Sequence, residues 1–202
     1  MLLYAALLLE ERAPTLAAAP ATLLASTIAN VALWDPELAE LLTAASPEDM
    51  LRPQRILKTL ADDRGWTPQV HPGWENGTMD DVSGRPQTHS ALLALADPGG
   101  ILHARLWSAQ VSVLLPAVEE RRLSLVRRLR HELRTPVHTG YGVVTDPTDL
   151  EIGQIAFQLR GRALPAAVYR QVQTLLRVRN ALAHGDPVSP AEALSPDLYR
   201  DV

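Results

Sequence analysis

The sequence predicts an all-α protein. Hydrophobic residues make up 47% of the 202-residue chain but aromatic residues only 4%, so most of the apolar content is aliphatic. Alanine and leucine dominate it, and they favour helices, whereas sheets are enriched in β-branched and aromatic residues. Apolar helical stretches are joined by turns rich in proline and glycine, with no alternating strand pattern between them. We therefore expect helices that pack as an antiparallel bundle.

The first twelve residues read as a buried helix. Their apolar run ends at Glu10 and Glu11, too early for a membrane span, and no basic residue precedes it as in a secretion signal. The chain contains no cysteine, which excludes a disulfide framework and a thiolate nucleophile. We expect a cytoplasmic protein with no membrane partner.

The first half of the chain contains three further predicted elements. A helical stretch at 15–33 is interrupted by Pro20, and Asp35 and Pro36 begin a second helix. Ser46, Pro47 and Asp49 form the start of a third, which we expect to run to about Arg64 because Ser46 can cap it.

Residues 66–88 are predicted to form a long loop or a small hairpin. The segment contains three prolines, three glycines and the turn pair Asn76-Gly77. Trp66 and Trp74 are expected to anchor it to the protein, with stacking against a ligand as the alternative. A loop of this length marks either a domain boundary or a functional surface.

The second half is predicted to be a helical bundle. Pro116 should kink or divide its longest helix. A turn at 135–148, rich in glycine, threonine and proline, separates that helix from the next. The expected helices are 90–96, 101–134, about 150–161, 166–184 and 191–199.

Charge divides the chain in the same way. Residues 1–100 carry 6 basic and 13 acidic side chains, whereas residues 101–180 carry 12 arginines and 6 acidic side chains. We accordingly predict an acidic helical region at 1–86 and a bundle at 87–202, and we expect any anionic partner to bind the bundle. The candidate residues for binding an anionic partner such as RNA are Arg121, Arg122, Arg127, Arg128, Arg130 and Arg134.

Residues 131–136, His-Glu-Leu-Arg-Thr-Pro, resemble the phosphoacceptor box of sensor histidine kinases. In that family the histidine lies on a helical hairpin and a separate domain binds ATP. Here a glycine-containing segment follows where the helix should continue, so we interpret the likeness as a coincidence. The arginines around it are then one face of a helix whose apolar stripe points inward.

The six histidines have no spacing typical of a metal site, such as HxH or HExxH. The chain's one lysine, Lys58, has no glycine near it, which excludes a phosphate-binding loop that needs both. We predict no metal and no cofactor.

The strongest signal lies at the end of the last long predicted helix. Residues 179–184 read Arg-Asn-Ala-Leu-Ala-His and are followed by Gly185. This run resembles the signature of HEPN domains, α-helical bundles of many prokaryotic toxins, defence systems and RNA-processing proteins. The resemblance covers about residues 87–202. It implies that Arg179 and His184 are the catalytic pair, that Asn180 is the accompanying polar residue, and that the protein is a metal-independent ribonuclease acting as a homodimer.

The residue types suit that chemistry without the family name. RNA is cut by its own 2′-hydroxyl when a base removes the proton and a cation stabilises the charge that gathers on the phosphate, which an imidazole and a guanidinium can do. On one helix, however, Arg179 and His184 lie about 140° apart around the axis. They converge only if the helix ends before His184 or if a second copy of the chain completes the site.

A non-catalytic interpretation of the same residues remains open. Arg179, Asn180 and His184 are also typical of an ordinary helix end, in which Arg179 pairs with a nearby carboxylate such as Asp186. The protein would then be a non-catalytic interaction or regulatory module whose arginine face binds an acidic protein partner, including a partner in a larger defence complex. Fold and activity are separate questions in a family that contains both enzymes and scaffolds.

Overall fold

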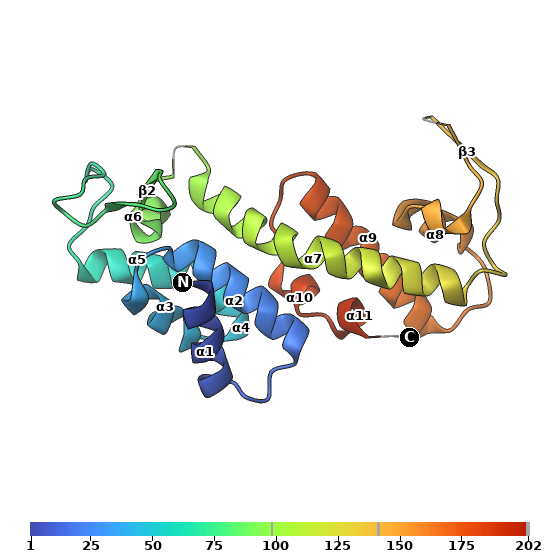
Figure 1. The fold of residues 1–202 in the computed structure, drawn as a ribbon, viewed down its shortest axis with the longest axis horizontal. Coiled ribbons are helices and arrows are strands. Elements are labelled where there is room, and N and C mark those ends of the chain that lie inside the picture. The colour runs from blue at the N-terminus through green and yellow to red at the C-terminus, as the bar shows by residue number, and fades with distance from the viewer. Residues whose placement is uncertain (98, 141, 201–202) are drawn as a thin grey trace.

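The computed structural model describes residues 1–97, 99–140 and 142–200 and confirms an all-α protein. The molecule is elongated, and its long helix α7 connects the N-terminal helices to the C-terminal ones (Figure 1). The helices are α1 (Leu2–Arg12), α2 (Ala18–Ala32), α3 (Pro36–Thr43), α4 (Pro47–Leu51), α5 (Gln54–Asp63), α6 (Ser90–Leu95), α7 (Ile101–Arg128), α8 (Ile152–Gln158), α9 (Ala166–Ala183), α10 (Pro190–Ala193) and α11 (Pro196–Tyr199).

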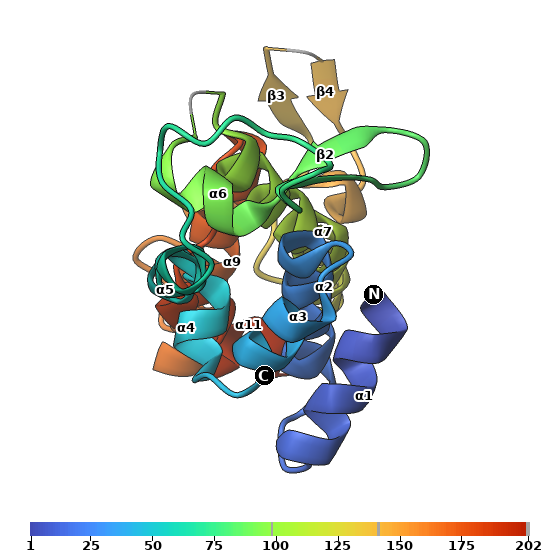
Figure 2. The ribbon, with the colours of Figure 1, turned by 90° about the vertical axis from the view of Figure 1, so that its left-hand side faces the viewer.

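Two short antiparallel hairpins complete the described part of the chain. Strands β1 (Met79–Asp81) and β2 (Pro86–Thr88) form the first, and β3 (Val137–Thr139) and β4 (Gly142–Val144) form the second. Both lie on the same side of the molecule, as the end-on view in Figure 2 shows. A single 3₁₀ turn, Pro147–Asp149, precedes α8.

Prolines determine where the N-terminal helices begin and end. Pro20 does not interrupt α2, because it lies in the first turn, where backbone N–H groups have no partner within the helix. The predicted helix 46–64 is instead two helices, since Pro53 separates α4 from α5. Ser46 caps α4 as predicted, accepting a hydrogen bond of 3.1 Å from the backbone N–H of Asp49.

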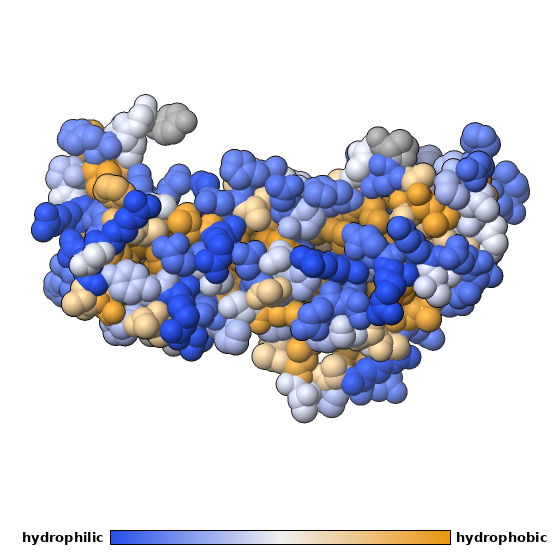
Figure 3. All heavy atoms as spheres, turned by 180° about the vertical axis from the view of Figure 1, so that it is seen from behind, coloured by the Kyte–Doolittle hydropathy of each residue, from blue (hydrophilic) through white to orange (hydrophobic). Residues whose placement is uncertain are grey.

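Helix α1 differs from the prediction of a buried helix. It buries Ala5 and Leu9, but Leu2, Leu3 and Leu7 are 57%, 75% and 54% exposed. The cause is that α1 is apolar on most of its circumference and packs against α2 and α3 on one side only. Figure 3 shows hydrophobic atoms at the surface of the protruding lower part of the molecule, which α1 and the loop after it form.

Helix α7 passes through Pro116 without being divided, and it ends at Arg128 rather than at Arg134. Pro136 disfavours a helical conformation at Thr135, and the chain has already left the helix before it reaches that residue. The buried side chains of Leu129 and Leu133 then hold the turn against the core. The predicted turn at 135–148 contains the β3–β4 hairpin.

The loop at 66–88 contains the predicted hairpin, but its turn is not at Asn76-Gly77. Ser83 and Gly84 form it, both with positive φ (58° and 78°), which is typical of a type I′ turn. Trp66 packs edge-on against the buried His89, with ring centroids 5.0 Å apart. Trp74 is 53% exposed, so its predicted anchoring role is wrong.

The hydrophobic core runs through both halves of the chain. Helix α2 packs along α7, and the buried Ser26 hydroxyl donates to the Ala109 carbonyl over 3.1 Å. Buried side chains of α1–α6 and of α7–α11 belong to one continuous cluster. That residues 1–86 and 87–202 are two separate domains stays a prediction.

A buried ionic cluster joins α3, α5 and α6. The Asp35 carboxylate lies 2.9 Å from both Arg64 Nη2 and His89 Nε2. His89 Nδ1 accepts the Ala91 backbone N–H over 3.1 Å, so the hydrogen of the neutral ring is on Nε2 and points to Asp35. Burial raises the pKa of Asp35, but the hydrogen bonds from His89 and Leu38 and the charge of Arg64 outweigh it and lower the pKa to about 2.

Candidate functional site

The motif lies at the C-terminal end of α9, which stops at Ala183 with His184 as its C-cap. Gly185 follows with φ of +84°, and its N–H donates to the Leu182 carbonyl over 3.2 Å. The Asp186 N–H donates to the Ala181 carbonyl over 3.0 Å. This pair of bonds is a Schellman motif, which explains why glycine stands at 185.

Three side chains of α7 hold this end of α9 and the segment after it. His103 Nε2 donates to the Gly185 carbonyl over 3.0 Å, and Trp107 Nε1 donates to the Leu182 carbonyl over 2.8 Å. The buried Gln110 accepts the Val188 N–H over 2.5 Å and donates to its carbonyl over 3.3 Å. The three residues have the spacing i, i+4 and i+7 and so share one face of α7. Sequence reasoning missed them, although polar side chains at that spacing on an apolar helix are a visible signal.

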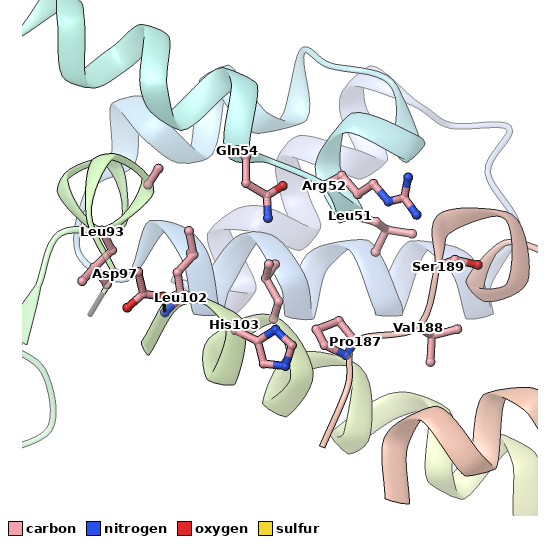
Figure 4. Close-up of a pocket in the computed structure, with 12 residues that line it drawn as sticks. Leu51, Arg52, Gln54, Leu93, Asp97, Leu102, His103, Pro187, Val188 and Ser189 are labelled. Atoms are coloured by element: carbon pink, nitrogen blue, oxygen red, sulfur yellow. Dashed lines mark hydrogen bonds between the residues drawn. The ribbon is translucent and has the colours of Figure 1, made fainter. Parts of the chain in front are cut away.

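A cavity of about 460 Å³ lies beside this segment, between α4, α6, α7 and residues 187–189. Its wall combines the apolar Leu51, Leu102 and Val188 with the polar Arg52 and His103 (Figure 4). The cavity lies between the N-terminal helices and the segment that follows the motif. Nothing in the sequence pattern indicated it.

Arg179 is partly exposed and already paired. Its Nη2 lies 3.0 Å from the carboxylate of Glu151, the N-cap of α8, and its Nη1 donates to Asn180 Oδ1 over 3.4 Å. The alternative interpretation expected Arg179 to pair with a nearby carboxylate such as Asp186; the carboxylate is that of Glu151, and Asp186 lies 3.7 Å from His103. Asp186 is turned away by the Schellman motif that follows α9.

Arg179 and His184 point in different directions. The His184 N–H still donates to the Asn180 carbonyl over 3.0 Å, so the helical path continues to His184 and the side chains remain about 140° apart around the axis. Arg179 turns toward α8, whereas His184 is exposed to solvent. The helix does not end early enough to bring the pair together within one chain.

The six candidate RNA-binding arginines have different environments. Arg122 is held in place, with its side chain only 12% exposed, and it donates to the Thr148 and Leu150 carbonyls over 2.6 and 2.7 Å and pairs with Glu119. Arg122 is therefore engaged within the protein and is not among the exposed members of the predicted RNA-binding set. Arg121 is half-buried. The exposed members of the set are Arg127, Arg128, Arg130 and Arg134.

Arg130 and Arg134 also differ from the predicted helix face. Both follow the end of α7, and so does His131 of the phosphoacceptor-like run. Arg134 is fixed through its backbone, whose N–H donates to Gln158 Oε1 over 2.7 Å and whose carbonyl accepts from Gln158 Nε2 over 3.1 Å. The exposed arginines therefore lie in the last turn of α7 and in the segment that joins α7 to β3.

A scan against models of known families, a search of curated proteins and a search of solved structures each found no match to this chain. Within the described residues, α7 is long and apolar enough to cross a membrane by length and composition, a test that the core helix of a globular protein also passes.

Proposed function

We propose that the protein is a metal-independent endoribonuclease of the HEPN type, acting as a homodimer in a toxin or antiphage defence system. One observation supports the proposal: the motif occupies a helix end held by side chains of α7, with His184 in solvent and the Arg179 side chain 41% exposed, so both groups are accessible although they point in different directions. The exposed pair with Glu151 is a weak restraint that a phosphate could displace.

The reaction is a transesterification of RNA. A base removes the 2′-hydroxyl proton, the 2′-oxygen attacks the phosphorus, and the bond to the 5′-oxygen breaks as that oxygen receives a proton. The products are a 2′,3′-cyclic phosphate and a 5′-hydroxyl. His184 is the acid or base, Arg179 stabilises the charge on the phosphate, and Asn180 orients Arg179 through the contact between them.

Because the two side chains diverge within one chain, the working site combines Arg179 of one copy with His184 of the other. A two-fold axis near the end of α9 would bring the two motifs face to face. The proposal therefore requires a dimer, and it requires that the two catalytic groups act across the interface.

The test uses purified chain, a labelled RNA and EDTA. Arg179→Ala and His184→Ala should each abolish cutting, whereas a co-purified dimer with one copy of each variant keeps one intact composite site and should regain up to half of the activity. Inactive mixed dimers, with both variants folded, would contradict a site shared between copies. A strictly monomeric wild type that cuts no RNA would remove the proposal.

The second candidate function is a non-catalytic interaction module. The observation that favours it is the Arg179–Glu151 pair, which neutralises the cation of the motif in the isolated chain. In that case no RNA is cut, and a stable complex with an acidic protein should survive Arg179→Ala but weaken with Arg127→Ala and Arg128→Ala.

A further inference from the structure

A groove of about 560 Å³ lies between α8 and the segment that leads into β3. Arg134, Pro136 and Val137 line one side, and Phe157 and Arg162 line the other. Phe157 is the one phenylalanine of the chain, and it is 68% exposed. A large aromatic side chain left in solvent at the wall of a groove suggests a ligand that stacks.

The exposure of Phe157 follows from the pattern of α8. Ile152, Ile155 and Ala156 face the core, which leaves Phe157 on the outer side. Gly153, four residues earlier, shares that outer face and has no side chain to cover the ring. A Cβ at Gly153 would make an ordinary van der Waals contact with Leu176 at 3.8 Å, so packing does not require a glycine there.

Guanidinium groups stand around the ring. The Arg160 guanidinium carbon lies over one face of the Phe157 ring, 5.5 Å from its centroid, so a stacked base uses the other face or displaces this guanidinium toward its own phosphate. Arg134 is exposed, has no side-chain partner among the described residues, and is held at the groove by the two backbone bonds to Gln158. Arg162 is engaged with Glu132 over 2.6 Å and contributes to the wall.

The surrounding charge selects an anion. The exposed arginines of residues 121–134 are Arg127, Arg128, Arg130 and Arg134, and residues 153–162 contain two arginines and no acidic residue. An aromatic platform inside a basic groove is the arrangement by which proteins hold unpaired nucleic acid, since every base has a face that stacks and every nucleotide a phosphate that pairs. An acidic peptide would satisfy the charge but would make no use of the exposed ring.

We propose that this groove binds single-stranded RNA, with one unpaired base stacked on Phe157 and the flanking phosphates paired with Arg134 and Arg160. The inference deepens the proposed function and takes its choice of RNA from it. Glu151, which pairs with Arg179, is the N-cap of α8, and Phe157 lies near the other end of that helix. A rise of 1.5 Å per residue separates them by about 9 Å along the helix axis, and at about 100° per residue they lie about 120° apart around it. A strand that contacts both places must therefore pass part of the way around α8.

The experiment measures binding of a fluorescein-labelled uridine 12-mer by anisotropy, in EDTA, with the full chain carrying His184→Ala so that the probe stays intact. Phe157→Ala should weaken binding by about five- to a hundredfold, the usual effect of removing one stacking side chain. Phe157→Trp should restore it. Gly153→Leu, which keeps the ring but covers it, should weaken binding as Phe157→Ala does, and Arg134→Ala should weaken it and lower its salt dependence.

Leu41→Ala is the matched control, because Leu41 is an apolar side chain 42% exposed on the distant α3. If Phe157→Ala and Leu41→Ala bind the probe equally, or if a glutamate 12-mer displaces the RNA at equal concentration, the inference is overturned. Cleavage by the wild type is scored separately. If Phe157→Ala loses binding and the wild type cuts no RNA, RNA binding in the groove is supported and the nuclease function is rejected. If the wild type and Phe157→Ala cut RNA at the same rate, RNA binding in the groove alone is rejected.

Discussion

The Arg179 guanidinium donates to the carboxylate of Glu151 over 3.0 Å, and this contact joins the end of α9 to the start of α8. Both side chains are substantially exposed, 41% and 66%, so the pair is weak and competes with any phosphate for the same cation. The contact therefore contributes little to stability, and under the proposed function its main effect is to compete with RNA for Arg179.

Glu151→Gln should raise the affinity for RNA and the cleavage rate by about two- to fivefold, because it removes the competing charge while keeping a side chain of the same size. Anisotropy and cleavage assays at low salt measure both effects. Glu48→Gln, an exposed change on the distant α4, is the control and should alter neither. Lower affinity in Glu151→Gln would mean that Glu151 assists Arg179 rather than competing with the RNA.

Trp107→Phe should lower the free energy of unfolding by about 1 kcal/mol, since it removes the hydrogen bond to the Leu182 carbonyl but keeps most of the packing. It should lower cleavage further than this cost explains, because the last turn of α9 positions His184. Urea unfolding and a cleavage assay below the unfolding range measure the two. Trp74→Phe, at an exposed position, should change neither, and equal activity of both variants would show that Trp107 does not position the motif.

Stability should fall in acid through Asp35. Its pKa is lowered from 3.8 to about 2 in the folded protein, so its contribution is fully present above pH 4 and is lost as the pH falls toward about 2. Urea unfolding at several pH values between 5 and 2 measures this loss. Asp35→Asn should be less stable at pH 5 and should show a shallower decline below pH 4. Parallel pH curves for the two proteins would mean that Asp35 does not carry the acid sensitivity.

Arg122 and Arg128 should have separable effects. Arg122→Ala removes two hydrogen bonds to backbone carbonyls and the pair with Glu119, so we expect a loss of about 2–3 kcal/mol in the free energy of unfolding. Arg128→Ala should leave stability unchanged within about 0.5 kcal/mol, because the side chain is exposed, and should weaken RNA binding and its salt dependence. Equal RNA affinity in wild type and Arg128→Ala would remove that arginine from the proposed surface.

The sequence predicted the fold class and most helices because these depend on local signals. The cap at Ser46, the glycine after His184 and the apolar periodicity of α9 each appear within a few neighbouring residues. The errors came from signals that depend on position within a helix or on distant packing. Pro20 lies in a first turn and is harmless, whereas Pro53 lies where it separates two helices.

The candidate site was less accessible to sequence reasoning. Arg179 and His184 could be found by their pattern, but not the partner of Arg179, because Glu151 is 28 residues away in the chain and reaches it only through packing of α8 on α9. For the same reason Arg122 could not be distinguished from its exposed neighbours. The pattern of α8 places Phe157 on the outer face, but one aromatic residue beside arginines indicates a ligand only once its exposure and the groove beside it are known.

The positions of the tryptophans allow the unfolding of the two halves of the chain to be followed separately by fluorescence. Trp34 and Trp66 both pack edge-on against His89, within the cluster that joins α3, α5 and α6, whereas Trp107 lies against the end of α9. In a variant whose only tryptophans are Trp34 and Trp66, the fluorescence reports on the N-terminal helices. In a variant whose only tryptophan is Trp107, it reports on the packing of α7 against α9. Coincident fluorescence transitions of these two proteins in urea would identify a single cooperative unit, and separate midpoints would identify residues 1–86 and 87–202 as two.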